Sequence, residues 1–260
     1  MSSQIPKKLI VGNWKMNTTI AEGSVLFNNL RKDIGDLADC DVVLCPPATH
    51  LFSLHRELIS NKNQSSFKLG VQNISEHEMG PYTGEISASM VKELVNYVIV
   101  GHSERRKYFN ETDKTDSQKL GIAMRHGLRP ILCVGETKQE RSDGHAKQTV
   151  LDQLNTALRG VTEKELKDLA IAYEPVWAIG TGNFAKPAVV EEMIMLVRNT
   201  LAQTYGRIAS THVRVLYGGS VSPQNTKAYL SLQGVDGLFV GGASLNHNQF
   251  SAIVKAATSA

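Results

Sequence analysis

The chain has 260 residues, of which 42% are hydrophobic and 20% are charged, proportions typical of a soluble globular protein. A formal net charge of +3 suits a small anionic substrate. The sequence has no long Lys/Arg run, and its aromatic residues are not interleaved with basic ones, which argues against a nucleic-acid partner. No apolar stretch approaches the length of a membrane span, and we expect neither a signal peptide nor a membrane partner. Cys40, Cys45 and Cys133 lack metal-ligand spacing, so we expect free thiols in a reducing cytoplasm.

Short apolar runs recur along the chain, and each is followed by a longer amphipathic segment. The runs are rich in Val, Ile and Leu with little alternation, as expected of parallel strands covered on both faces. They lie at residues 8–13, 41–46, 67–73, 97–102, 129–136, 169–175, 213–219 and 236–242. Segments with a helical pattern lie between them, for example at 24–34, 87–96, 146–158, 188–205 and 223–232, with Ser87, Pro187 and Pro223 at expected helix starts.

The regular spacing of these units indicates the fold class. There is no long linker or shift in composition, so we expect one domain over residues 1–260. Eight strand–helix units predict an α/β fold, a closed (β/α)₈ barrel of parallel strands with outer helices. A doubly wound open sheet is the alternative. It would usually have a glycine-rich nucleotide loop after the first strand, and GNWKMN at 12–17 is not such a loop.

Polar residues follow several of the predicted strands, where a barrel places its active site. They are Asn13 and Lys15 after the first run, His102 and Glu104 after the fourth, Glu136 after the fifth and Glu174 after the sixth. Singly, each has an ordinary structural interpretation: a solvated lysine, a hydrogen-bonded histidine or a helix-capping glutamate. Their joint placement favours a functional site, because the strand pattern fixed these positions without reference to chemistry.

Two glycine pairs end the last two predicted strands, in YGGS at 217–220 and VGGASL at 240–245. A single pair is more simply read as a turn. Two pairs at neighbouring strand ends suit an anion, because glycines let backbone N–H groups approach an oxyanion closely. Phosphate sites after strands 7 and 8 recur in this fold. We therefore expect a phosphate ester, to which Lys15 could add a point charge.

Glu174 stands between an apolar run and Pro175. Burying its charge unpaired would cost several kcal/mol, so it is either a satisfied structural acid or a base. Ser103 is a plausible N-cap of a short helix at 104–109, and the positive end of that helix favours a neutral His102 ring. A neutral imidazole could donate to a carbonyl oxygen while Glu174 removes a proton from the adjacent carbon. This chemistry needs no metal and no cofactor.

The motifs GNWKMN, VGHSERR, CVGE, AYEPVWAIGTG, YGGSV and VGGASL span residues 12–245 and resemble the triosephosphate isomerase family in sequence and order. The resemblance implies a TIM barrel that interconverts dihydroxyacetone phosphate and D-glyceraldehyde 3-phosphate through an enediol(ate), in glycolysis and gluconeogenesis. It implies that Glu174 is the base, His102 the electrophile and Glu104 a residue that orients or pairs with Lys15. Asn13 and Lys15 would contact the substrate, and the phosphate would be held by Gly180, Ser220, Gly241 and Gly242.

The resemblance further implies a moving lid and a homodimer. Residues 175–182 resemble the lid, and residues 72–87 resemble the loop that inserts into the partner, with Thr83 at its tip. Two departures stand out: Asn183-Phe184-Ala185 replaces the common Lys-Thr-Ala at the second hinge of the lid, and Pro81 replaces a small residue.

Two alternative functions remain. An enzyme for a larger sugar phosphate would need an extra loop that the chain lacks, and a silent relative would be expected to have lost Lys15, His102 or Glu174.

Overall fold

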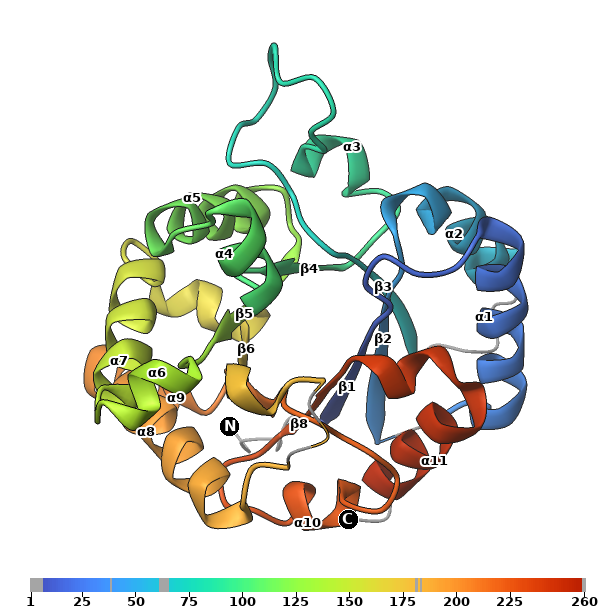
Figure 1. Ribbon diagram of the computed structural model, residues 1–260. Coiled ribbons are helices and arrows are strands. Elements are labelled where there is room, and N and C mark those ends of the chain that lie inside the picture. The colour runs from blue at the N-terminus through green and yellow to red at the C-terminus, as the bar shows by residue number, and fades with distance from the viewer. Residues whose placement is uncertain (1–6, 38, 61–65, 181, 183, 259–260) are drawn as a thin grey trace.

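The protein is described by a computed structural model that covers residues 7–37, 39–60, 66–180, 182 and 184–258. Its strands are all parallel, they pair in chain order, and β8 pairs with β1, so the sheet closes into a barrel (Figure 1). The predicted (β/α)₈ barrel with outer helices is confirmed, and the open doubly wound sheet is excluded. The strands are β1 Lys8–Asn13, β2 Cys40–Cys45, β3 Phe67–Val71, β4 Tyr97–Val100, β5 Arg129–Val134, β6 Ala170–Tyr173, β7 Arg214–Tyr217 and β8 Gly237–Val240.

Each predicted run overlaps one of these strands, but seven of the eight strands end before the run does. The run at 97–102 ends as a strand at Val100, because Gly101 then adopts a positive φ of 72° that turns the chain. His102 and Glu174 therefore lie in the turns that follow the strands. That position lets their side chains face the carboxyl-terminal end of the barrel, which we call the mouth.

Helices form a ring around the strands, as Figure 1 shows. Pro187 begins the longest one, as predicted, because a proline at the first helical position loses no hydrogen bond. The prediction was wrong at Pro223, since that helix begins only at Thr226, and the segment 87–96 forms one helical turn rather than a full helix. The α-helices are α1 Ile20–Ile34, α2 Leu51–Ser60, α3 Ala88–Val91, α4 Ser103–Phe109, α5 Asp113–Arg125, α6 Lys138–Ser142, α7 Ala146–Ala157, α8 Pro187–Tyr205, α9 Arg207–Ser210, α10 Thr226–Leu230 and α11 His247–Thr258. Short 3₁₀ helices are η1 Ala48–His50, η2 Glu163–Asp168, η3 Val176–Ala178 and η4 Gly242–Leu245.

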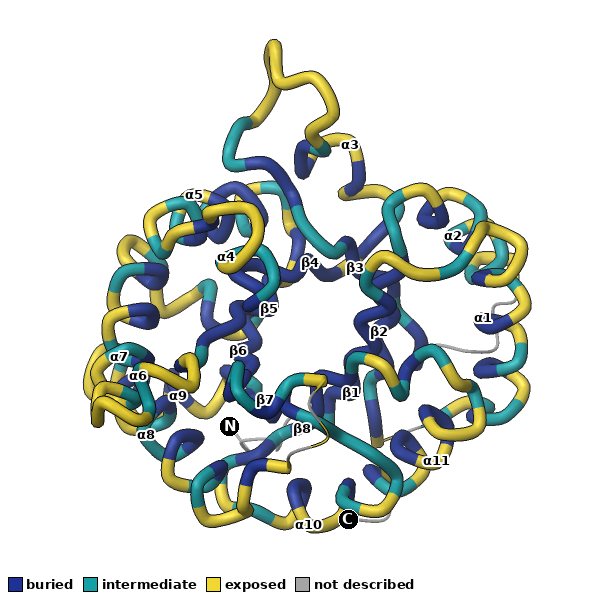
Figure 2. The backbone as a smooth tube through the Cα atoms, viewed as in Figure 1, coloured by how far each residue is buried: buried dark blue, intermediate teal, exposed yellow. Residues whose placement is uncertain are grey.

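The core has two layers, and both are apolar. Successive strand residues point to opposite faces, so Leu9 and Val11 belong to the inner cluster and Ile10 to the layer beneath the helices. Figure 2 shows the strands as the most deeply buried part of the chain. This burial on both faces explains why the strand runs lack a polar alternation. That residues 1–260 form one domain stays a prediction.

One segment leaves the barrel. The loop between β3 and α3 projects beyond the ring of helices, and its outermost part is exposed (Figures 1 and 2). Thr83 lies in this loop and is exposed. The rings of His77 and Tyr82 stack within it at a centroid separation of 3.9 Å. Glu78 ties it to α5 through Arg125 at 2.8 Å and to the adjacent His126 at 2.6 Å. These contacts, within the loop and with the end of α5, hold the loop in shape, although its outer surface is exposed.

Candidate active site

The end of β1 delivers the cation of the site. Asn13, the last residue of β1, is buried, and its Oδ1 accepts the backbone N–H of Lys15 at 3.0 Å. Gln72 donates to the carbonyl oxygen of Lys15 at 2.8 Å. Lys15 has a φ of 54°, which is uncommon outside glycine, and these two bonds hold it there. Its Nζ lies 2.5 Å from Glu104 Oε1, so the lysine is paired as well as positioned.

His102 follows β4 and is itself the N-cap of α4, so the prediction of Ser103 as the cap was wrong. Its Nδ1 accepts the backbone N–H of Glu104 at 3.3 Å, which leaves the proton of a neutral ring on Nε2. That Nε2 lies 3.2 Å from Glu174 Oε1. Burial lowers the pKa of His102, but the adjacent Glu174 carboxylate outweighs it, and the pKa lies above its ordinary value. The sequence analysis considered only the helix N-terminus, which favours a neutral ring, and did not include the effect of the Glu174 carboxylate on the pKa of His102.

Glu174 follows β6 and is only 2% exposed. Its carboxylate is not unpaired, because Oε2 accepts the backbone N–H of Ser103 at 3.2 Å while Oε1 contacts His102. Burial raises the pKa of Glu174, but His102, the Ser103 N–H and the more distant Lys15 together lower it below its ordinary value. The group is therefore ionised at neutral pH, the state that a general base requires.

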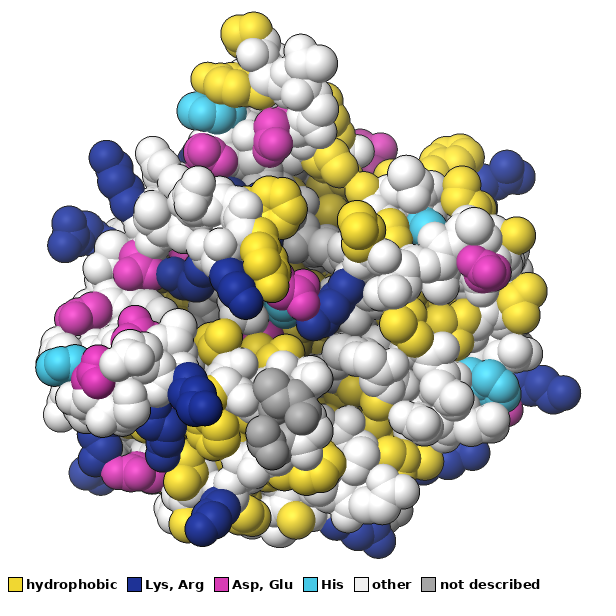
Figure 3. Space-filling model, viewed as in Figure 1, with side chains coloured by type: hydrophobic (Ala, Val, Ile, Leu, Met, Phe, Trp, Pro, Cys, Tyr) yellow, Lys and Arg dark blue, Asp and Glu magenta, His cyan; other side chains and the backbone are white. Residues whose placement is uncertain are grey.

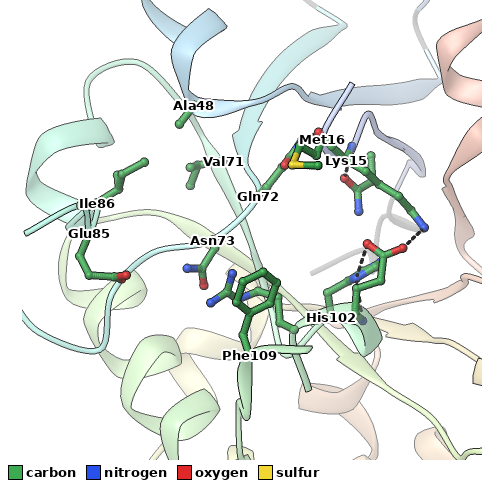
Figure 4. Close-up of a pocket in the computed structure, with 14 residues that line it drawn as sticks. Lys15, Met16, Ala48, Val71, Gln72, Asn73, Glu85, Ile86, His102 and Phe109 are labelled. Atoms are coloured by element: carbon green, nitrogen blue, oxygen red, sulfur yellow. Dashed lines mark hydrogen bonds and ion pairs between the residues drawn. The ribbon is translucent and has the colours of Figure 1, made fainter. Parts of the chain in front are cut away.

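A cavity of about 220 Å³ brings most of the predicted residues together. Its walls include the ionisable residues Lys15, His102 and Glu174. They also include the small, uncharged residues Gly180, Ser220, Gly241 and Gly242. Asn13 and Glu104 line instead an adjoining cavity of about 410 Å³, which shares Lys15 and His102 and also has apolar walls (Figure 4). Thr83 lines neither. Figure 3 shows cationic, acidic and histidine side chains gathered at the centre of the mouth.

The walls after β7 and β8 offer backbone rather than side chains. Within the described parts of the chain, the N–H groups of Ser220, Gly241 and Gly242 have no protein acceptor. The Ser220 hydroxyl donates to the carbonyl oxygen of Ala178 at 2.5 Å. Free amides beside the Lys15 ammonium form a place where the oxygens of a phosphate could be bound.

Glu136, noted in the sequence at a strand end but given no role, holds the start of the lid segment. It is fully buried, and its carboxylate accepts from the Trp177 indole at 2.8 Å and from the Tyr173 hydroxyl at 3.2 Å. Arg141 pairs with it at 3.0 Å. The acid thus fixes η3 directly after Glu174. Its partners lie on separate elements, so no local pattern could have identified them.

A second buried group of charges, which the sequence analysis missed, supports the turn before His102. Glu111 accepts the backbone N–H of Gly101 at 3.0 Å, and Arg106 donates to the Gly101 carbonyl at 2.7 Å. Asp116 pairs with Arg106 at 2.5 Å, and Lys119 with Glu111 at 2.6 Å. In the sequence these residues resemble the solvated side of a helix. Only the fold shows that Glu111, Asp116 and Lys119 are buried and that Arg106 is half-buried.

The fold and this geometry define a class of protein, the parallel (β/α)₈ barrels, here with a lysine, a histidine and a glutamate beside glycine-rich turns at the mouth. Among the described residues, no helix is both long and apolar enough to cross a membrane, and no side-chain cluster has the composition of a metal site.

Comparison with known proteins identifies the family. The family model described as triosephosphate isomerase matches residues 8–257. Triosephosphate isomerase of Clostridium tetani is 45% identical over 249 residues, 95% of this chain and 96% of that protein. The proteins of the same name from Herminiimonas arsenicoxydans and Caldanaerobacter subterraneus are 42% and 44% identical, cover 96% and 95% of this chain, and match over 99% and 98% of their own lengths. The chain belongs to the triosephosphate isomerase family.

The structure describes part of the second hinge of the lid, where we expect a departure from the family. Asn183 lies outside the described residues. Phe184 is exposed, and Ala185 is buried immediately before the residue that caps α8.

Proposed function

We propose that this protein is an isomerase that interconverts dihydroxyacetone phosphate and D-glyceraldehyde 3-phosphate, with Glu174 as base and His102 as the hydrogen-bond donor to the carbonyl oxygen. Family membership supports the reaction. The observation that carries the residue roles is the single cavity that joins Lys15, His102 and Glu174 to the glycine walls after β7 and β8.

The proton path follows from the hydrogen bonds. Nδ1 of His102 is occupied by a backbone N–H, so Nε2 presents the proton. A bound triose would place its carbonyl oxygen at Nε2 and so replace the Glu174 carboxylate as the acceptor. Glu174 would then take a proton from the carbon next to the carbonyl, and the oxygen of the resulting enediolate would be stabilised by His102 and Lys15. Return of the proton to the neighbouring carbon completes the isomerisation.

The phosphate would be bound by Lys15 and by the free N–H groups of Ser220, Gly241 and Gly242, with Gly180 contributed by the lid segment. Glu104 would hold the Lys15 ammonium in place, and Asn13 would fix the backbone of Lys15 and contact the substrate. Closure of the lid, of which this family is a standard example, would exclude water and strengthen these interactions.

The reaction is tested directly by mixing the protein with D-glyceraldehyde 3-phosphate in D₂O and following the products by proton NMR. We expect dihydroxyacetone phosphate to form, with deuterium incorporated at the carbon that exchanges its proton with Glu174. Conversion without any deuterium incorporation would show that the abstracted proton returns to the neighbouring carbon before it exchanges with the solvent. A folded protein that converts nothing would make the silent-relative alternative correct.

We also propose a homodimer in the cytoplasm, in which the exposed loop around Thr83 enters the partner's cavity beside Lys15. Support comes from the shape of the projecting loop and from the adjoining cavity, whose walls include exposed Met16 and Phe109. Sedimentation equilibrium measures the assembly. We expect a dimer for the wild type and a monomer for Thr83→Arg, and a wild-type monomer at micromolar concentration would contradict the assembly.

A further inference from the structure

One polar side chain lies on the buried face of α7. The buried residues of that helix are Val150, Gln153, Leu154 and Ala157, which have the spacing of a helical face turned toward the core. Gln153 is only 8% exposed, and it does not line the cavity that contains Glu174. An apolar side chain would be less costly to bury at this position, because a buried amide needs hydrogen-bond partners. The partners of Gln153 therefore indicate what the residue does.

Both partners belong to one residue, Gly135, in the turn after β5. The Oε1 atom of Gln153 accepts the Gly135 N–H at 2.8 Å, and its Nε2 donates to the Gly135 carbonyl oxygen at 3.1 Å. Within the described residues, no other group forms a hydrogen bond with this N–H or with this carbonyl oxygen. The amide thus holds both polar groups of a single residue, which fixes the orientation of the turn more firmly than one bond could.

The same turn holds the backbone of Glu174. The Glu174 N–H donates to the Val134 carbonyl oxygen at 2.7 Å. Two residues further along each segment, the Val176 N–H donates to the Glu136 carbonyl oxygen at 3.0 Å. Between these bonds the two segments touch, because a Cβ added to Gly135 would overlap the Glu174 carbonyl oxygen. A shift of Gly135 is therefore passed to the Glu174 backbone.

On the basis of the proposed isomerase, we propose that Gln153 is a positioning residue for the base, which fixes the Gly135 turn and, through that turn, the backbone of Glu174. The Glu174 carboxylate is oriented at its far end by His102 and the Ser103 N–H. Gln153 sets the point from which the side chain starts. Proton removal needs both, because reacting atoms must lie about 3 to 3.5 Å apart, and a misplacement of about 1 Å can cost about 100-fold in rate.

The experiment compares Gln153→Met with the wild type. Methionine keeps the length and the unbranched shape of the side chain but forms neither bond to Gly135. We expect kcat for isomerisation to fall about threefold to thirtyfold, because the Glu174 backbone is held less firmly in the productive position. KM should stay within about twofold, because the proposed phosphate contacts are unchanged.

A second measurement reports on the proton transfer itself. The substrate carries deuterium at the carbon from which Glu174 takes the proton, and its kcat is compared with that of the ordinary substrate. Slower proton removal limits turnover more strongly relative to product release, so the isotope effect on kcat should be at least as large in Gln153→Met as in the wild type. A fall in kcat with a smaller isotope effect would place the loss in another step and would overturn the proposal.

Ser66→Ala is the matched control. Ser66 is also buried, and its hydroxyl likewise accepts the N–H of one residue, Leu37, at 2.8 Å and donates to the carbonyl oxygen of that residue at 3.0 Å. It directly precedes β3, at the end of the barrel opposite the mouth. This variant should lose thermal stability but keep the wild-type kcat and isotope effect.

A wild-type kcat in Gln153→Met, with thermal stability lowered as in Ser66→Ala, would show that Gln153 is merely structural and would also overturn the proposal. Gln153→Leu, which likewise lacks both bonds, serves in its place if the methionine variant does not fold, with the same expected results. Failure of the wild type to isomerise would contradict the proposed function instead, so the two failures are distinct.

Discussion

The half of the mouth that follows β4 and β6 differs from the half that follows β7 and β8 in how it presents charge. His102 and Glu174 are 4% and 2% exposed, and each is fixed by a backbone N–H and by the other. Gly241 and Gly242 offer only backbone, and a Cβ added to Gly242 would meet nothing within 4 Å. Proton transfer needs side chains with fixed positions and adjusted pKa values, whereas phosphate binding needs open space and unpaired amides. Changes in the first half should therefore alter turnover, and changes in the second half should alter substrate affinity.

The largest effect is expected from Glu174→Gln. The variant keeps the shape of the side chain and removes the proposed base, so kcat should fall by about 10² to 10⁴, with a small change in KM. Steady-state kinetics in both directions measure this. Glu136→Gln is a useful comparison, since it changes a buried glutamate near the lid that does not take the proton. A loss of less than tenfold for Glu174→Gln would remove Glu174 from the role of base.

The second largest effect is expected from Lys15→Ala, because Lys15 lines the cavity together with residues of both halves of the mouth. It removes a charge next to the proposed phosphate site and takes the lysine partner away from Glu104, so an unreactive phosphate-bearing inhibitor should bind about 10- to 100-fold more weakly. Isothermal titration calorimetry gives the dissociation constant. The control is Lys107→Ala, which removes a lysine that lies over the exposed Tyr108 ring on the same helix as Glu104. Equal inhibitor affinity in wild type and Lys15→Ala would contradict a contact between Lys15 and the substrate.

Two glycine substitutions sharpen the comparison between the halves. Gly242→Ala should raise KM about tenfold and change the free energy of unfolding by less than about 0.5 kcal/mol, because the new methyl group meets only the incoming phosphate. Gly218 follows β7, but in Gly218→Ala the added Cβ would lie 2.9 Å from Glu174 Cγ, so this variant should act on the first half and lower kcat by displacing the proposed base. Should both variants change the same kinetic parameter, the two halves would not have separate tasks.

The smallest effect concerns the charges that support the turn before His102. Burial raises the pKa of Asp116 to about 8, although Arg106 opposes this. An acid whose pKa is raised on folding contributes stability that is complete below its unfolded pKa and is lost as pH rises through the folded value. The free energy of unfolding should therefore decline between about pH 4 and pH 8, and Asp116→Asn should decline less over that range. Parallel curves from urea unfolding at several pH values would contradict this assignment.

The sequence predicted the architecture well, because the signal for it is local. An apolar run of Val, Ile and Leu bounded by polar residues identifies each strand without knowledge of its neighbours. The helix starts were less well predicted: Pro187 begins α8, but α10 begins only at Thr226, since the residues after Pro223 form a turn. The N-cap of α4 was misplaced by one residue, because the ring of a histidine was not expected to accept the Glu104 N–H.

The sequence by itself determined the strand order, the residues at the strand ends and the family, because each of these depends only on which residues occur and in what order. Only the tertiary structure decided which groups meet. It paired Lys15 with Glu104, joined Glu174 to the Ser103 N–H, and placed Tyr229 against Ala185, 44 residues away. It also set the pKa values, since burial and neighbouring charges arise only when distant segments pack. Contacts between groups far apart in the chain depend on the closed barrel, and no local pattern contains them.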